Sequence, residues 1–343
     1  MIGEEKHTSW RLEDHRMARR PQTLPESPSG PNSAPEQSQA HDLSTAPSEP
    51  TGRAKESMLG TLARLEALSA ERTKKRQSEE TAKILQLPLP IWPDQVRGVP
   101  NVALRSALFG AIKRGPRRYM DREIVTSLDG YEVRYTGPRL DQADLDVWEQ
   151  CLHLARQGGV GCRIHFTAHS FLKNIHRSTG GKDVEWLKSA FSRLASAVIE
   201  AKHGKFAYFG PMIQHGGRDD ETGEYCIEMN PAIVALYGPD GWSQIDWQQR
   251  QQLKRQPLAQ WLHGFYSTHA QPFPLKVKTL HQLSGSENGA LFDFRRQLRL
   301  ALDKVSEATG WTWRIDENDL VHIVKTPTPS QAKHLARRSK KKD

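Results

Sequence analysis

Two long stretches in the second half of the chain carry apolar residues at helical spacing. In each stretch an apolar residue recurs on the same side of the predicted helix at every helical turn, while charged and polar residues occupy the other positions. A stripe with this period is typical of an amphipathic helix that packs one face against a core. We therefore predict one long helix over about 183–202 and another over about 290–308. The stripes are Leu187, Phe191, Leu194 and Val198 in the first, and Leu291, Phe294, Leu298, Ala301 and Val305 in the second.

The elements around these two helices are predicted to follow one order. A helix, a short strand and a small helix precede each one, at about 141–157, 162–166 and 169–176, and again at about 257–269, 274–277 and around 280–283. A break rich in glycine and serine follows, at 178–181 and at 284–289. Two strands come after each long helix, flanking the loop 216–223 in the first copy and forming a hairpin over 311–324 in the second. The pattern is that of a helix-turn-helix with a wing, and it occurs twice.

This order predicts an α+β fold of two tandem winged-helix domains, residues 92–240 and 241–325, preceded by a long disordered N-terminal region. Within the first domain we also expect a helix from Asn101, as N-cap, to Lys113. A hairpin is predicted over 119–135 around the two-residue turn signal Asp129-Gly130. A short helix should begin after Asn230, with Pro231 at its first position.

The flanking segments differ in composition from the predicted domains. Residues 1–55 are dense in Pro, Ser, Gln and Glu and are expected to be disordered, because they cannot bury enough apolar surface to order themselves. Residues 56–91 predict a marginal amphipathic helix followed by a proline-rich linker. A basic tail, 326–343, is also expected to be disordered.

Charge and composition narrow the function classes. The chain has 343 residues, with 49 Lys and Arg against 40 Asp and Glu, a net charge of +9, which favours a polyanionic partner. It contains no apolar run of about 18 residues, so we expect no membrane span, and its first residues predict no secretory signal. Three cysteines without a C-x-x-C pair fit a reducing cytosol, so a cytoplasmic location is expected.

A search for catalytic motifs points away from an enzyme. Gly181-Lys182 resembles the end of a P-loop, but His176 and Asp183 occupy positions that need glycine and serine or threonine. His165 and His169 straddle a strand-to-helix change, so packing or capping is favoured over metal binding.

A tyrosine-type strand-transfer enzyme is the rival from another class. His153 and His334 each begin a loose H-x-x-R pattern, yet the last tyrosine is Tyr266, so no nucleophile follows the second. We therefore predict no catalytic residue, no metal and no cofactor.

Binding to DNA is better supported by the cations that lie off the apolar stripes. Arginine can bond the edge of guanine with two hydrogen bonds, while lysine mainly contacts phosphate. The alternative, that these are ordinary solvated helix faces, stays open, and more so for the first helix. The cations are Lys182, Lys188 and Arg193 on the first helix, and Arg295, Arg296 and Arg299 on the second.

Several short, collinear segments resemble TrfA-type plasmid replication initiators over roughly 85–325. They are Leu89-Pro-Ile-Trp-Pro-Asp-Gln95, Asn101-Val-Ala-Leu-Arg-Ser-Ala-Leu-Phe109, Val133-Arg-Tyr-Thr-Gly137, Asp146-Val-Trp148, Pro274-Leu-Lys276 with Thr279, and Asn318-Asp-Leu-Val-His322. The resemblance implies an initiator that binds repeated origin sites, called iterons, opens AT-rich DNA nearby and recruits host replication proteins without nucleotide or covalent chemistry. Its implied partners are origin DNA, a host replication initiator, a replicative helicase and the sliding clamp, with a homodimer as an inactive store.

The resemblance also distributes roles among the candidate residues. In related initiators the second winged helix contacts most of the bases, which implies that Arg295, Arg296 and Arg299 recognise sequence. Lys276 and Lys278 are then expected at the DNA backbone. Lys182, Lys188 and Arg193 are expected as secondary contacts.

Two alternatives remain open at this stage. Family members carry a clamp-binding peptide, Gln-Leu-x-Leu-Phe, and here Gln86, Leu87 and Leu89 match it without the aromatic end, so a clamp peptide and a plain linker are weighed evenly. A winged-helix transcriptional repressor without an initiator role would also show the same architecture.

Overall fold

The computed structural model describes residues 60, 63–75, 89–113, 115–128, 130–158, 161, 163–203, 206–238 and 240–339. Contacts divide the chain into a unit up to Arg64 and a unit from Leu65 to Asp343, and the second contains nearly all described residues. Residues 63–75 are helical, with Leu65 and Leu68 exposed, in line with the predicted amphipathic helix. The predictions for residues 1–55, for most of the proline-rich linker and for Asp129 fall outside the described residues.

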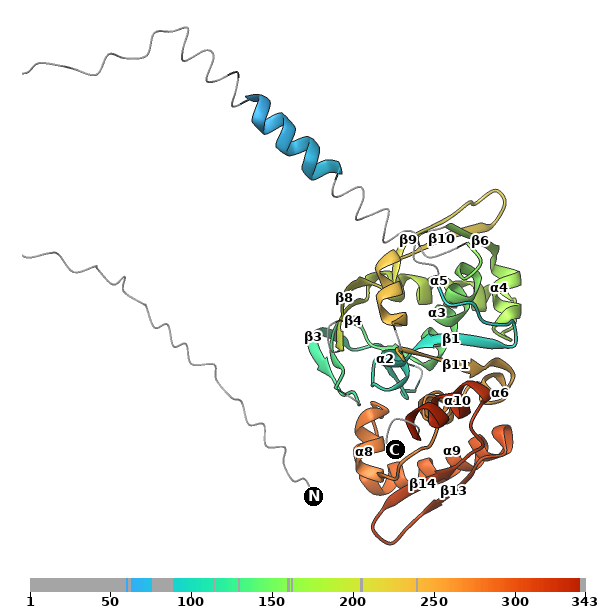
Figure 1. The fold of residues 1–343 in the computed structure, drawn as a ribbon. Helices are drawn as coiled ribbons and strands as arrows, with labels where there is room; N and C mark the ends of the chain where they lie inside the picture. Colours follow the sequence, from blue (N-terminus) through green and yellow to red (C-terminus); the bar gives the residue numbers. More distant parts are fainter. Residues whose placement is uncertain are drawn as a thin grey trace, which may run out of the picture. The chain divides into compact units, whose positions relative to one another are not determined.

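The described part of the second unit is a mixed fold of helices and short sheets (Figure 1), all antiparallel except the pair β2-β5. Its buried apolar side chains form two separate clusters. Buried side chains from Leu89 to Trp247 form the first cluster. The second cluster runs from Leu253 to Ile323. The short helix α6 (Trp247–Gln252) lies in the chain between them.

Around the first cluster, a helix, a strand and two helices are followed by a hairpin. These are α3 (Gln142–Ala155), β6 (Arg163–Thr167), α4 (Ala168–Asn174), α5 (Gly181–Ser196), β9 (Ile213–Arg218) and β10 (Glu224–Met229). Asp141 and Asp144 form a capping box that starts α3. Strand β10 pairs antiparallel with both β6 and β9, so the sheet order is β6-β10-β9.

The elements around the second cluster repeat this order. They are α7 (Pro257–Ser267), β12 (Leu275–Lys276), α8 (Val277–Leu283), α9 (Leu291–Thr309), β13 (Thr312–Ile315) and β14 (Leu320–Val324). The sheet order is β12-β14-β13, so again the strand between the helices pairs with the last strand of the hairpin. Gly310, at φ 72°, ends α9 in the left-handed conformation that glycine adopts without strain.

The first cluster carries further sheets with no counterpart around the second. A four-stranded sheet joins β3 (Tyr119–Val125), β4 (Glu132–Pro138), β7 (Val198–His203) and β8 (Phe206–Pro211). Strand β1 (Val96–Pro100) pairs with β11 (Trp242–Asp246), and β2 (Phe109–Gly110) with β5 (Leu140–Asp141). The 3₁₀ helix η1 (Pro231–Tyr237) begins at the predicted Asn230 cap, which accepts a bond from the Ala232 amide.

Two predicted helices are shorter than expected. The helix predicted over 101–113 is only α2 (Asn101–Leu104), and Asn101 is not its N-cap, since its amide bonds the Asp240 carbonyl and the Ser243 hydroxyl. The helix predicted over 183–202 ends at Ser196, because the chain turns extended at Ala197 and Val198 begins strand β7. In both places pairing with distant segments decides the conformation, which a local stripe cannot reveal.

Three further predictions need correction. The 119–135 strands pair as expected, but their last pair is Val125 with Val133, so the connection is longer than a two-residue turn. The loop predicted at 216–223 is shorter, because β9 continues to Arg218. The C-terminal tail contains α10 (Pro329–Ser339), which is held by a bond from the Gln331 amide to the Ser267 carbonyl.

One buried arginine on α6 joins the elements of the two clusters. Arg250 is fully buried, and its Nε lies 2.7 Å from Asp146 Oδ1 and 3.2 Å from Glu149 Oε2, both on α3. Its remaining nitrogens donate to the carbonyls of Gln142, which starts α3, and Gln260 on α7. Burial raises the pKa of Glu149 to about 7, against the attraction of Arg250. A single guanidinium therefore connects α3 to α7.

Other contacts reinforce this junction at separate points. Trp261 Nε1 on α7 donates to the Ser106 carbonyl at 3.2 Å, and Arg105 Nε donates to Thr268 Oγ1 at 2.8 Å. Arg139 binds the Gly285 carbonyl and lies 2.8 Å from Glu287. The two sets of elements thus meet through specific polar contacts.

Replacing Arg250 by Met should destabilise the fold by about 3–5 kcal/mol at pH 8.5, because two buried carboxylates would lose their counter-charge. Removing the cation raises the folded-state pKa of Glu149 further above its unfolded value. Below about pH 7 the Glu149 carboxyl is protonated in the folded wild type and in the folded variant alike. The loss of stability caused by Arg250→Met should therefore be smaller at pH 5.5 and grow as the pH rises.

Denaturant unfolding at several pH values measures this loss. Arg122→Met, at an exposed ion pair with Glu200, is the control and should change stability little at any pH. A loss for Arg250→Met that is equal at pH 5.5 and 8.5 would contradict the buried-charge explanation.

Candidate nucleic-acid interface

The outward face of α9 is a surface of exposed arginines and one exposed aromatic ring. Phe294, Leu298, Ala301 and Val305 are buried in the second cluster, as the stripe predicted. The opposite face therefore presents Phe292, Arg296 and Arg299, spaced four and three residues apart. Phe292 is 73% exposed and the Arg296 side chain 69% exposed. We call these three residues the α9 face.

The two arginines of the α9 face are available for a partner. Arg296 Nη2 lies 3.6 Å from Asp293 one turn away, a contact between exposed groups that contributes little. Arg299 is exposed, and no ion pair of it is found among the described residues. Both guanidinium groups can therefore bind bases or phosphates without breaking a strong contact.

Arg295 has a different environment from its two neighbours. Its Nε lies 3.0 Å from Asp319 Oδ1, and its Nη2 contacts the other carboxylate oxygen. Asp319 sits at φ 64° in the turn between β13 and β14. The pair holds the hairpin against α9. The ion pair of Arg295 thus positions the β13–β14 hairpin. Lys276, the last residue of β12, and Lys278, in the first turn of α8, are exposed.

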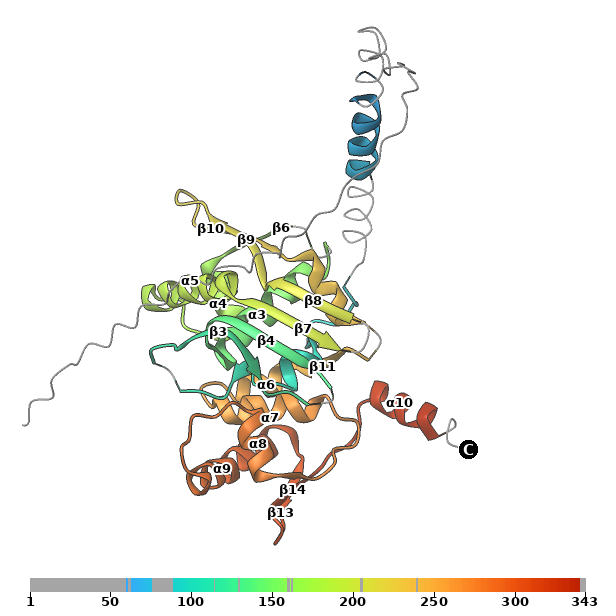
Figure 2. The ribbon, with the colours of Figure 1, turned by 90° about the vertical axis from the view of Figure 1, so that its left-hand side faces the viewer.

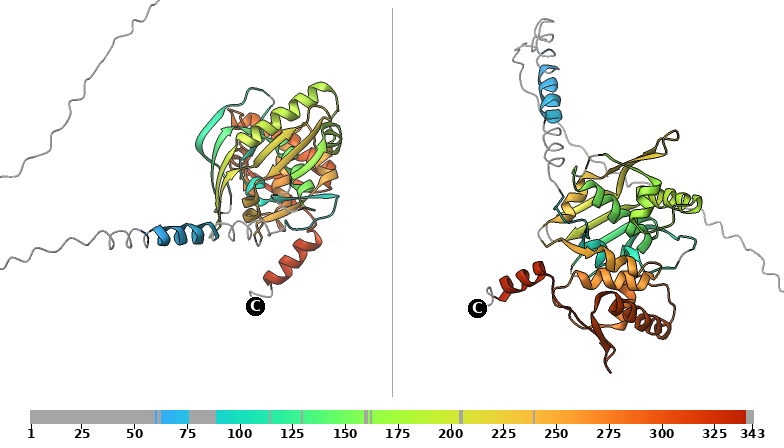
Figure 3. Two further views of the ribbon diagram at one scale, coloured as in Figure 1. Left: turned by 90° about the horizontal axis from the view of Figure 1, so that it is seen from above. Right: turned by 90° about the vertical axis from the view of Figure 1, so that its right-hand side faces the viewer.

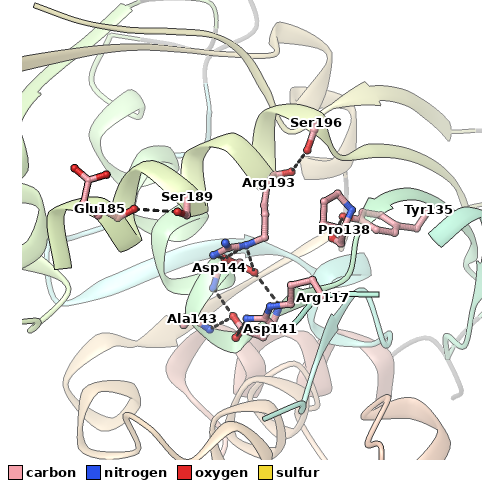
Figure 4. A network of polar contacts seen from close by, with 10 residues as sticks. All are labelled: Arg117, Tyr135, Pro138, Asp141, Ala143, Asp144, Glu185, Ser189, Arg193 and Ser196. Atoms are coloured by element: carbon pink, nitrogen blue, oxygen red, sulfur yellow. Dashed lines mark hydrogen bonds and ion pairs between the residues drawn. The ribbon is translucent and has the colours of Figure 1, made fainter. Parts of the chain in front are cut away.

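The candidate cations of α5 are less available than those of α9. Lys182 is exposed near the start of the helix, whereas Lys188 Nζ lies 2.6 Å from Glu185. Arg193 points inward to Asp144, with Nη2 2.7 Å from Oδ1 (Figure 4). The Asp144 carboxyl is fully buried, and burial raises its pKa to about 6 although Arg193 opposes the shift. Arg193 therefore links α5 to α3 and does not lie on an open surface.

The proposed clamp peptide is also affected by burial. Gln86 and Leu87 lie outside the described residues. Leu89, in contrast, is 1% exposed and belongs to the first apolar cluster. In this conformation its side chain is packed in the interior and is not accessible to another protein.

Some residues near the α9 face were not identified from the sequence. Phe292 is the clearest, and its signal was a large aromatic side chain located off the apolar stripe. Asn288, before α9, and Gln297, on it, bond each other through their amides at 3.1 Å. In the first hairpin, Arg218 lies over the Tyr225 ring, 5.8 Å from its centre. These groups add polar and cationic surface beside both long helices.

The long helices of the two sets lie on one side of this part of the chain. Figures 2 and 3 show α5 and α9 on the same side and α10 on the opposite side. A single extended partner could therefore approach both α5 and α9. The same partner would not reach α10.

Two of the three residues of the rival strand-transfer hypothesis, Tyr266 and His153, are located in the interior. Tyr266 is 1% exposed, and burial raises the pKa of its hydroxyl. His153 is packed within α3, where Nδ1 accepts a bond from Trp92 Nε1, and burial lowers its pKa to about 4. His334 is exposed on α10. Tyr266 and His153 are therefore not accessible to a DNA strand in this conformation.

The described residues also lack two other features, a cluster of metal ligands and a membrane-spanning helix. No group of three or more His, Cys, Asp or Glu side chains there could hold a metal ion. None of the helices in the same residues has the length and apolar content needed to span a membrane.

Arg193→Ala and Arg299→Ala should separate an interior arginine from a surface one. The first leaves the buried Asp144 without its counter-charge and should cost about 3–5 kcal/mol of stability. The second removes an exposed group and should change stability by less than about 0.5 kcal/mol. Thermal unfolding measures both, and Asp144→Asn added to Arg193→Ala should recover part of the loss. Equal melting temperatures for the two single variants would contradict the assignment of Arg193.

Comparisons with known proteins agree with the resemblance seen in the sequence. The family model described as TrfA protein matches residues 61–325. The plasmid replication initiator protein TrfA of Escherichia coli is 26% identical over 261 residues, covering 72% of this chain and 67% of that protein.

Solved structures of other proteins are more distant. The Pi initiator protein in complex with iteron DNA has a TM-score of 0.40 at 10% identity, covering 52% of this chain and 91% of that one. Domains 2 and 3 of RctB have a TM-score of 0.42 at 12% identity, covering 66% of this chain and 96% of that one. The family match spans more than three quarters of the sequence, and on that basis the chain belongs to the TrfA family.

Proposed function

We propose that this protein is a plasmid replication initiator that binds repeated origin sites through the α9 face. The observation that carries the proposal is the exposure of Phe292, Arg296 and Arg299 on one side of a helix that follows a helix-turn. Membership of the TrfA family supports it, since a curated relative is a plasmid replication initiator. Arg296 and Arg299 would bond guanine edges in the major groove, while Lys276 and Lys278 would contact phosphates.

We propose that the two sets of elements are tandem winged-helix domains. Their common element order and the matching sheet orders, β6-β10-β9 and β12-β14-β13, support this interpretation. Strand β11 pairs with β1, and Trp247 packs in the first cluster, so we place the boundary after α6 rather than at residues 240 and 241. Winged helices present their second helix to DNA, which is α5 in the first domain and α9 in the second.

The two helices would contribute differently to binding. In α9, an aromatic ring and two arginines are exposed together, which suits base contacts. In α5, Arg193 is directed inward, and the remaining candidates, Lys182 and Lys188, are suited to phosphate contacts. The first domain would therefore add affinity, and the second would determine sequence.

We propose that the later steps follow the family pattern. The bound protein would open AT-rich DNA next to the repeats and recruit a host replication initiator and the replicative helicase. It would act by binding, without a cofactor or a covalent step, and a homodimer would store it. The buried Leu89 argues against Gln86, Leu87 and Leu89 as a sliding-clamp peptide, so the clamp is left out of the proposal.

Binding to the repeats next to the gene should be specific and strongly dependent on salt. The protein should shift a duplex carrying these repeats far more readily than a shuffled duplex. With about 6–10 phosphates contacted, affinity should fall roughly 10³–10⁵-fold between 50 and 200 mM salt. Arg296→Ala should cost about 1–3 kcal/mol of binding and relax preference at one base position. Equal affinity for the repeat and shuffled duplexes would refute the proposal.

A replication assay distinguishes an initiator from a repressor with the same architecture. A plasmid with the origin but without this gene should fail to replicate, and the gene supplied elsewhere in the cell should restore it. Survival of the plasmid without the gene would favour the repressor.

Phe292 should contact a thymine methyl group. Its exposed ring lies one turn before Arg296, where an apolar group can meet the methyl that marks thymine in the major groove. Replacing single thymines by deoxyuridine removes that methyl and should weaken wild-type binding at one position by about 0.8 kcal/mol, or roughly fourfold. Phe292→Ala should bind more weakly and be insensitive to the change at that position.

Leu300→Ala provides the matched control for Phe292. Leu300 is also exposed on α9, at 63%, but lies about two turns further along the helix than Phe292. This variant should keep the wild-type sensitivity to deoxyuridine. A Phe292→Ala protein with the same sensitivity as wild type would exclude the thymine contact.

A further inference from the structure

Two grooves meet at the junction of the proposed domains and share two basic lining residues. The first, of about 320 Å³, extends from the start of α3 to Ser178 and Asp183 at the beginning of α5. The second, of about 910 Å³, extends along α9 past Gln297 and Lys304. Lys113 and Arg255 line both grooves. They therefore lie on the path between α5 and α9.

Exposed cations without carboxylate partners gather at this junction. Lys113, Lys254 and Arg255 are exposed, and no ion pair of any of them is found in the described part of the chain. Lys254 Nζ makes only a long bond, 3.4 Å, to the His176 carbonyl. We call these three residues the junction patch.

Most acidic groups in the grooves are already paired with other arginines or lysines. The pairs are Asp141 with Arg117, Asp146 with Arg250, Asp183 with Arg177, Glu287 with Arg139 and Glu307 with Lys304. Asp303 is the exception among the lining carboxylates, as no ion pair of it is found in the described residues. The junction therefore has an excess of positive charge that the protein itself does not neutralise.

The backbone of the patch is held in a fixed and strained turn. Arg255 has φ 67°, in the left-handed region that residues other than glycine and asparagine rarely adopt. The turn is closed by bonds from the Leu253 amide to the Arg250 carbonyl and from the Gln256 amide to the Leu253 carbonyl. Arg250 in turn is anchored to α3. A large cation at a position that favours glycine is consistent with a binding role, since strained residues gather at functional sites.

We propose that the junction patch binds the DNA backbone between the segments contacted by α5 and α9. This inference rests on the proposed function, because it assigns a further contact to the same DNA. A duplex that passes from α9 to α5 crosses both grooves, where ammonium and guanidinium groups meet phosphate oxygens. These contacts increase affinity and keep the two domains in register on the duplex, and they do not depend on base sequence.

A double variant and a matched control test the patch. Lys254→Gln with Arg255→Gly removes two charges, and glycine suits the turn. Lys333→Gln with Arg337→Gln removes two exposed charges from α10, on the opposite side. Affinities for the repeat duplex and for a shuffled duplex are measured between 50 and 200 mM salt, with thermal unfolding as the check on folding.

The patch variant should bind both duplexes more weakly, with the preference for the repeats unchanged. The slope of log affinity against log salt should become shallower by about 1.8, since each lost phosphate contact contributes about 0.9. The α10 variant should keep the wild-type slope. Methylphosphonates placed between the segments protected by α5 and α9 should weaken wild type and leave the patch variant unaffected.

Each failure has a distinct signature. If wild type does not prefer the repeats, the proposed function fails, while the slope on the shuffled duplex still tests the patch. An unchanged slope for a folded patch variant overturns the inference. Equal losses in the patch and α10 variants also overturn it, because they would reflect net charge alone. If the double variant does not fold, Lys254→Gln alone should lower the slope by about 0.9.

Discussion

The way in which helices α3 and α7 pack together depends on one buried guanidinium group, that of Arg250. An isolated buried charge is strongly unfavourable, so Arg250 is stable in the interior only while Asp146 and Glu149 face it. Both carboxylates belong to α3, whereas the Gln260 carbonyl that Arg250 also bonds belongs to α7. Separating the two apolar clusters would take the Gln260 carbonyl away from Arg250 and the Gln260 side-chain amide away from Asp146, leaving the buried charges less well satisfied. The orientation of α5 relative to α9 is therefore determined by electrostatics at the junction as well as by apolar contact.

Pairing of charges also separates the structural cations from those left for a partner. Arg193 and Arg295 each meet a carboxylate of their own chain, buried Asp144 in one case and Asp319 of the wing turn in the other. Arg296 and Arg299 project into solvent instead. All four lie off an apolar stripe, so their positions along the helices do not distinguish them. Their partners come from segments 24 or more residues away in the chain, and only the folded structure brings these together.

The elements that could be predicted from the sequence are those whose conformation is determined by residues close together in the chain. Helix α9 has a continuous apolar stripe and ends at Gly310, and the hairpin after it is closed by a short turn of acidic residues. The sequence therefore predicted both elements closely. The helix predicted over 183–202 was too long because Val198 pairs with Thr136 in β4, a long-range contact that leaves no periodic signal. Most candidate cations could be identified as basic positions off a stripe. Phe292 left a signal of the same kind, an aromatic residue off the stripe, whereas the junction patch left none, because the meeting of two grooves is a property of the packed structure.

The two proposed domains share one element order but present unequal surfaces to a partner. In the first, β7 and β8 are inserted between α5 and its hairpin and extend a sheet with β3 and β4. Its long helix directs Arg193 to the interior. In the second, the hairpin follows α9 directly, and Arg295 holds it in place while the neighbouring positions stay exposed. In the proposed function, such a division would let the first domain and the junction patch hold any duplex through its phosphates, and sequence would then be recognised by one helix whose hairpin is fixed by its own ion pair.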